Sequence, residues 1–198
     1  MVTRTSSATP PHALTIDVED YFQVGVFQDR LPTSEWENMT PRVERNVDRL
    51  LTLLDERDIR ATFFILGWIA EKHPKCIEAI AKAGHEIGSH GHGHIPIWNL
   101  TPEEFDADIE RSQGVIGDAI GRAPTLYRAP CFSVTPKTTW ALDIIHAHGI
   151  RHDSSILPVR HPEYGMPGAE EGIHRIRLKD GGELLEFPMS TVRFLGRQ

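Results

Sequence analysis

Short apolar segments of β-strand type alternate with helical patterns along most of this sequence, and this alternation constrains the fold more than any other feature. Six strands are expected, over residues 13–18, 61–66, 85–89, 125–128, 150–153 and 183–187. Strands that alternate with helices are typical of βα units built around a parallel sheet. The sequence therefore predicts an α/β fold.

Short polar signals mark the expected helices. Three of them begin at a Thr-Pro pair, starting at Thr40, Thr101 and Thr135, where the hydroxyl can cap the helix and proline fits the first helical position. The four helices are expected over 41–57, 74–84, 102–121 and 136–149. A long loop is expected over 157–172, and no repeat or low-complexity linker divides the chain. We expect one domain over 13–198, preceded by a disordered lead-in over 1–12.

Composition narrows the classes of partner and compartment. The 198 residues suit one domain, and a formal net charge of −7 with no basic run argues against a nucleic-acid partner. The longest apolar stretch, 61–70, is shorter than the roughly 20 residues of a membrane helix, so no transmembrane segment is expected. The N-terminus has no apolar signal-peptide region, which makes the cytoplasm the expected compartment. Cys76 and Cys131 lie far apart and predict neither a disulfide nor a thiolate metal site.

Histidine is concentrated in one short segment. Four of the 11 histidines fall within residues 85–94, where an even spread would put about half of one. Gly91 and Gly93 separate His90 from His94 and favour a tight loop around a cation over a helix. The alternative is a surface loop that happens to hold histidines. His92, between the two candidate ligands, is expected to face solvent and is given no role.

Carboxylates follow the first expected strand. Asp17, Glu19 and Asp20 are three acidic residues within four positions. Crowded carboxylates repel one another and favour a bound cation, although a solvated acidic turn is the alternative. Two imidazoles and one carboxylate would leave open positions for water, as in catalytic zinc sites.

Two further polar residues follow the fourth and fifth expected strands. Arg128 precedes a rigid turn through Pro130 and Cys131. The arginine could bind a carboxylate through two parallel hydrogen bonds, while the turn directs backbone N–H groups into the site. Asp153 could orient the arginine or another group that contacts the reacting atoms. A structural salt bridge and a turn-capping aspartate are the alternatives for these two residues.

These segments, in this order, resemble the polysaccharide deacetylases of carbohydrate esterase family 4, which have the NodB-homology fold. The resemblance covers about residues 14–187. Three of the family's motifs, Thr-Phe-Asp-Asp, His-x-x-x-His and Arg-x-Pro, are matched by Thr15-Ile16-Asp17, His90 to His94 and Arg128-Ala129-Pro130. Segments 17–22 and 185–197 look most like the subgroup associated with exosortase and exopolysaccharide loci. The resemblance implies a distorted (β/α) barrel, left incomplete if the chain ends early.

The resemblance also implies catalytic roles. Asp17 is the implied catalytic base, and Arg128 orients it while being held by Asp153. The backbone N–H of Cys131 is the implied donor to the oxyanion.

A divalent metal is implied as the cofactor, with zinc expected first and cobalt, nickel or iron as alternatives. His90 and His94 are its implied ligands. Because Val18 occupies the position of the family's second aspartate, the third ligand is expected from Glu19, with Asp20 as the alternative.

The implied function is metal-dependent hydrolysis of N-acetyl groups on an amino-sugar polysaccharide or oligosaccharide. The family's closing Leu-x-His motif, which supplies a general acid, has no counterpart after Phe187. The chain is therefore expected to be truncated, and His161 and His174 are substitutes without motif support. Two alternatives are a cyclic-imide or allantoin-type amidohydrolase of the same superfamily and a catalytically inactive carbohydrate-binding fragment.

Overall fold

A seven-stranded sheet forms the centre of the computed structural model, which describes residues 12–27 and 30–192. The strands are β1 (Thr15–Val18), β2 (Thr62–Ile65), β3 (Glu86–Ser89), β4 (Leu126–Tyr127), β5 (His152–Asp153), β6 (His174–Arg177) and β7 (Glu183–Glu186). Their order is β1-β2-β3-β4-β5-β7-β6, and every pair is parallel except β6 with β7. The lead-in expected over 1–12 lies, apart from residue 12, outside the described residues.

All six expected strands are present, and the predicted parallel α/β architecture is confirmed. The sheet is not closed, because β1 and β6 are its two edges. Strand β6 was not among the expected strands. Its residues alternate between half-buried and exposed, and Ile176 is the single apolar side chain among charged or polar ones, so it lacks the apolar run that marks the other strands.

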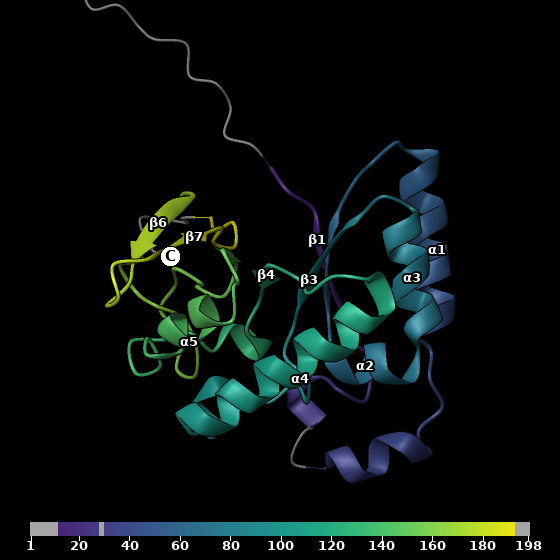
Figure 1. Cartoon of the computed structure of the whole chain (residues 1–198), viewed down its shortest axis with the longest axis horizontal. Coiled ribbons are helices and arrows are strands. Elements are labelled where there is room, and N and C mark those ends of the chain that lie inside the picture. The colour runs from purple at the N-terminus through teal and green to yellow at the C-terminus, as the bar shows by residue number, and fades with distance from the viewer. Residues whose placement is uncertain (1–11, 28–29, 193–198) are drawn as a thin grey trace, which may run out of the picture.

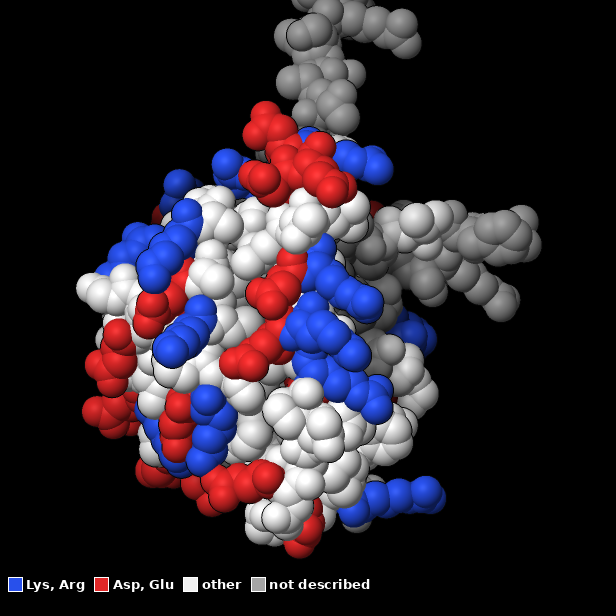
Figure 2. Space-filling view, turned by 90° about the vertical axis from the view of Figure 1, so that its right-hand side faces the viewer, with Lys and Arg blue, Asp and Glu red and all other residues white. Residues whose placement is uncertain are grey.

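The described residues form five α-helices: α1 (Val43–Glu56), α2 (Gly67–Lys72), α3 (Pro74–Lys82), α4 (Pro102–Ile120) and α5 (Ala141–Ala147). Figure 1 shows α1 and α3 side by side next to the strands β1 to β3, while α5 lies near β6 and β7. On the side that carries α1 and α3, acidic and basic side chains are interspersed (Figure 2). None of the helices in the described part of the chain is long and apolar enough to cross a membrane.

The helix starts follow the sequence signals in part. Thr101 caps α4 as expected, in a capping box with Glu104, and Gly121 ends that helix with a φ of +78°. The Thr135-Pro136 pair opens a turn instead, and α5 begins only at Ala141. The hydroxyl of Thr138 holds this turn by accepting a hydrogen bond from the Thr135 N–H.

Helix α1 begins two residues later than the Thr40-Pro41 pair predicts. Its first N–H groups, on Arg42 and Val43, donate to the carboxylate of Asp20 at 2.5 and 2.9 Å. A side chain distant in the sequence therefore caps this helix, which no local pattern can reveal.

The apolar residues of β2 point alternately to two faces. Phe63 and Ile65 pack in the core beneath the helices. Phe64 points the other way and lines a cavity of about 150 Å³ together with residues of β1, β4, β5 and β7, so the sheet curves around this space. Burial on both faces explains why β2 is an uninterrupted apolar run.

Candidate metal centre and active site

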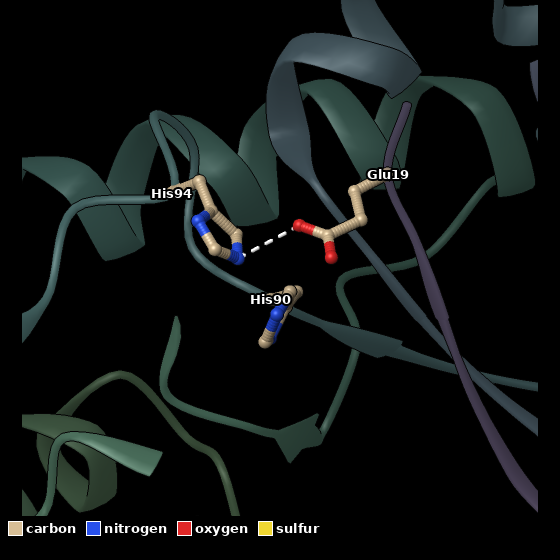
Figure 3. A group of neighbouring side chains, drawn as sticks. All are labelled: Glu19, His90 and His94. Atoms are coloured by element: carbon tan, nitrogen blue, oxygen red, sulfur yellow. Dashed lines mark ion pairs between the residues drawn. The ribbon is translucent and has the colours of Figure 1, made fainter. Parts of the chain in front are cut away.

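The carboxyl ends of β1 and β3 bring three of the predicted ligands together. Glu19 follows β1, and His90 and His94 lie in the loop after β3. One ligand atom from each residue lies within 4.8 Å of the others, and Figure 3 shows the three side chains converging from two segments. Since β1 and β3 both pair in parallel with β2, their carboxyl ends lie at the same end of the sheet. The candidate site lies at this end.

The imidazoles face the carboxylates through their Nε2 atoms. His94 Nε2 lies 2.8 Å from Oε2 of Glu19, and His90 Nε2 lies 4.0 Å from Oδ2 of Asp17. The His90 Nδ1–H donates to the backbone carbonyl of Arg128 at 2.8 Å, which leaves the Nε2 lone pair directed at the site. Burial lowers the pKa of His90, so its ring is neutral and able to bind a metal.

These residues fit a divalent cation. Glu19 Oε2 is buried and accepts no hydrogen bond from the described residues, although His94 lies beside it. A buried carboxylate oxygen without a donor is costly unless a charge compensates it. Two imidazole nitrogens and one carboxylate oxygen are the donor set of catalytic zinc and of mononuclear iron sites.

Asp20, the alternative ligand, is directed elsewhere. It is buried, and its two carboxylate oxygens accept hydrogen bonds from the N–H groups of Tyr21, Arg42 and Val43. The structure therefore separates the neighbouring carboxylates, with Glu19 in the group of potential ligands and Asp20 at the start of α1.

Arg128 holds Asp17 from the buried side of the site. Its Nη1 donates to Asp17 Oδ1 at 2.7 Å, and its Nη2 donates to the hydroxyls of Thr15 and Ser154, both at 2.9 Å. Its Nε donates to the Ser154 carbonyl at 3.2 Å, and the guanidinium lies 4.2 Å from the centre of the Phe64 ring. The Asp17 side chain is 28% exposed against 3% for Arg128, so the carboxylate faces the open side.

The expectation that Asp153 holds Arg128 directly is wrong. No hydrogen bond or ion pair in the described ranges joins them; instead, Asp153 Oδ1 accepts a 2.5 Å hydrogen bond from the Ser155 hydroxyl. Asp153 also faces Glu186, its register partner on β7, whose Oε1 accepts from the Ile156 N–H. Burial, followed by the charge of Asp153, raises the pKa of Glu186 well above its ordinary value. Burial also raises the pKa of Asp153, so both carboxyl groups hold their protons to higher pH than exposed carboxyl groups do.

Cys131 lies in the short helix η4 (Pro130–Phe132), in which it and Phe132 have φ values of +56° and +48°. Two consecutive non-glycine residues in this region store strain of the kind that is common at functional sites. Burial, with added repulsion from Glu19 and Glu163, raises the pKa of the Cys131 thiol to about 11. The thiol stays protonated, so the backbone N–H is the group that this residue can offer for catalysis.

The prediction that His92 faces solvent is wrong. Its side chain is 9% exposed, and Nε2 lies 3.1 Å from Oε2 of Glu71, which also accepts a hydrogen bond from Arg111 at 2.9 Å. The reason is α2, a helix that was not among those expected from the sequence. The helix begins at Gly67, where an added Cβ would lie only 2.8 Å from the His92 ring.

Among the described residues, neither of the two substitute histidines contacts a residue of the site. His161 stacks on Tyr164, and His174 lies on the edge strand β6, where its Nδ1–H donates to the Gly172 carbonyl. Thr15 and Ser154 also contact Arg128 through their hydroxyls. Thr15 was expected only as part of the first family motif, without a role of its own, and nothing in the local sequence singles out Ser154.

Two family models match different parts of the chain. Residues 29–152 match the family described as Polysaccharide deacetylase, and residues 154–198 match a domain of unknown function, DUF3473. The first match contains His90, His94 and Arg128 and begins after Asp17 and Glu19.

Curated relatives carry related names. A peptidoglycan deacetylase of Helicobacter pylori is 31% identical over 114 residues, which are 58% of this chain and 38% of that protein. A peptidoglycan-N-acetylglucosamine deacetylase of Bacillus cereus is 26% identical over 118 residues, 54% of this chain and 43% of that protein. The chain thus spans less than half the length of these two relatives.

Solved structures share the fold. The crystal structure described as a "putative polysaccharide deacetylase from Mycobacterium smegmatis" superposes with a TM-score of 0.68 at 27% identity, covering 96% of this chain and 64% of that one. A family 4 carbohydrate esterase pseudoenzyme from Bacillus anthracis has a TM-score of 0.53 at 20% identity, and the superposition covers 70% of this chain and 40% of that one. This similarity supports the fold alone. On the family match and the residues that it contains, this chain belongs to the polysaccharide deacetylase family.

Proposed function

We propose that this chain is a metal-dependent hydrolase that removes N-acetyl groups from an amino-sugar polysaccharide by cleaving the carbon–nitrogen bond. The observation that carries the proposal is the convergence of Glu19, His90 and His94 beside the half-buried carboxylate of Asp17. Family membership supports deacetylation of amino-sugar polymers, and the donor set supports zinc as the cation.

Glu19, His90 and His94 would hold the cation. When bound, a divalent cation supplies Lewis acidity to the acetyl carbonyl and to the attacking water. Asp17 takes the proton from that water as general base. Arg128 occupies Oδ1 of Asp17, which leaves Oδ2, the oxygen that faces His90, to receive the proton.

The backbone N–H of Cys131 would donate to the acetyl oxygen as negative charge develops on it. Removing one such donor commonly costs about 3 kcal/mol of transition-state stabilisation. The turn that carries this N–H is tied to β5, because the Ser155 hydroxyl accepts a hydrogen bond from the Ala129 N–H at 2.8 Å and donates to Asp153. Asp153 therefore acts on the turn through Ser155.

Acetate release from N-acetylglucosamine oligomers tests the proposal, because two curated relatives are named for peptidoglycan. Exopolysaccharides are the next substrates to test, since the exosortase-associated subgroup stays a prediction. The metal-stripped protein is assayed after adding one equivalent of zinc, cobalt, nickel or ferrous iron. Acetate release with one of these metals supports the function. Metal binding without release from any acetylated glycan would favour the inactive carbohydrate-binding fragment.

Three variants test the roles. His90→Ala and His94→Ala should abolish metal binding, whereas Asp17→Asn should retain the metal and lose turnover. His146→Ala is the matched control, because this histidine lies on α5 and pairs with Asp180 away from the site. Retained turnover in Asp17→Asn would overturn the assignment of the base.

A further inference from the structure

The loop between His90 and His94 has its backbone bonded on both sides. On one side, the first N–H groups of α2 bind its carbonyl oxygens. The Gly67 N–H donates to the Gly91 carbonyl at 2.8 Å, and the Trp68 N–H donates to the His92 carbonyl at 3.1 Å. These bonds fix the carbonyl side of the loop to the helix that follows β2.

On the other side, α4 holds the loop through Asp108. The His92 N–H donates to Asp108 Oδ2 at 2.9 Å, and the Gly93 N–H donates to Oδ1 at 3.2 Å. One turn later on α4, the Ser112 hydroxyl donates to the Gly91 carbonyl at 3.0 Å. Each oxygen of the carboxylate thus receives one of two consecutive backbone N–H groups, and such charge-assisted bonds are stronger than neutral ones.

The glycine after His90 is what lets the carboxylate approach so closely. Gly91 has a φ of +71°, and a Cβ at this position would lie 2.9 Å from Asp108 Oδ2. A residue with a side chain would therefore displace the carboxylate as well as strain the backbone. The glycine and the aspartate form a matched pair, one on the loop and one on α4.

We propose that Asp108 is a positioning residue of the metal centre, whose carboxylate fixes the backbone of residues 91–93 and thereby the separation of His90 and His94. The inference rests on the proposed metal site. An asparagine of the same shape has one carbonyl oxygen and an NH₂ group, and the NH₂ group cannot accept the second N–H. Loss of a residue that orients metal ligands typically lowers metal affinity by about 10–100-fold.

The test compares Asp108→Asn with Asp106→Asn. Asp106 lies two residues earlier on α4, is exposed and pairs with His148 at 2.8 Å. The zinc dissociation constant of each metal-stripped protein is measured by competition with a chromophoric chelator, and the visible spectrum of the cobalt form reports ligand geometry. Asp108→Asn should raise the dissociation constant about 10–100-fold and alter the cobalt spectrum, whereas Asp106→Asn should match the wild type. Wild-type affinity in Asp108→Asn would overturn the proposal.

Hydrogen exchange of the wild-type protein keeps the proposal testable if Asp108→Asn does not fold. The backbone amides of His92 and Gly93 should be protected from exchange in the metal-free form. If they exchange as fast as amides in a solvent-exposed loop, the proposal is overturned. A wild-type protein that binds no zinc would end the proposed function and this inference together. Zinc binding that is indifferent to Asp108 would end this inference alone.

Discussion

Replacing Arg128 by lysine keeps a positive charge beside Asp17 and removes the planar fork that orients it. The guanidinium donates four hydrogen bonds to oxygen atoms of Asp17, Thr15 and Ser154. A lysine ammonium is a single nitrogen that can reach the Asp17 carboxylate and one hydroxyl from the same position. At least two of the bonds are therefore lost in Arg128→Lys.

The expected cost follows from those two bonds. A hydrogen bond from a charged donor contributes about 1.5–3 kcal/mol. We take the lower value because Ser154 already donates to the Phe187 carbonyl at 2.7 Å, which gives about 3 kcal/mol in total. For a chain of about 200 residues, 1 kcal/mol lowers Tm by about 2–4 °C, so Arg128→Lys should lower it by about 6–12 °C.

The same change should lower kcat about 100-fold, because a displacement of the base by about 1 Å costs this much. That ratio corresponds to about 2.7 kcal/mol in the activation barrier. Thermal unfolding and the rate of acetate release measure the two effects. Arg151→Lys is the control, since that exposed arginine donates to the backbone carbonyls of His146 and Ile150. A variant at position 128 with wild-type Tm and kcat would refute the reasoning.

Two further predictions concern buried carboxyl groups outside the proposed ligand set. Asp20→Ala should lower the free energy of unfolding by about 1–2 kcal/mol through loss of the α1 cap and leave zinc affinity unchanged; lost zinc binding in a folded variant would make Asp20 a ligand. Glu186→Gln should flatten the pH dependence of stability. Burial raises the pKa of Glu186 in the folded protein. Its contribution to the free energy of unfolding is therefore fully present below its pKa in the unfolded chain, about 4.3, and is lost as pH rises through its pKa in the folded protein. Denaturant titrations from about pH 4 to pH 9 measure this, and parallel curves for wild type and variant would contradict it.

Local sequence patterns predict the strands and the loops that carry the candidate site residues. The apolar runs that became β1 and β3 are each followed directly by polar residues, and because both strands pair in parallel with β2, their carboxyl ends meet at the same end of the sheet. The sequence therefore suffices to place Glu19, His90 and His94 in one region.

Roles that depend on a distant partner are not visible in the sequence. Glu19 and Asp20 are adjacent and chemically alike, and the start of α1, more than 20 residues later, decides which of them turns inward as a cap. Asp108 reads as one more polar residue beside the apolar stripe of α4, although it binds the loop after β3. The pairing of Asp153 with Glu186 depends on the register of β5 with β7, which the sequence does not encode locally.

The most direct test of the central claim is anomalous scattering from a crystal of the zinc-loaded protein, recorded at the zinc absorption edge. We expect one strong peak at about 2.0–2.2 Å from a carboxylate oxygen of Glu19, from His90 Nε2 and from His94 Nε2. A peak held by other residues, or no peak after incubation with excess zinc, would contradict the claim that these three side chains form a metal centre.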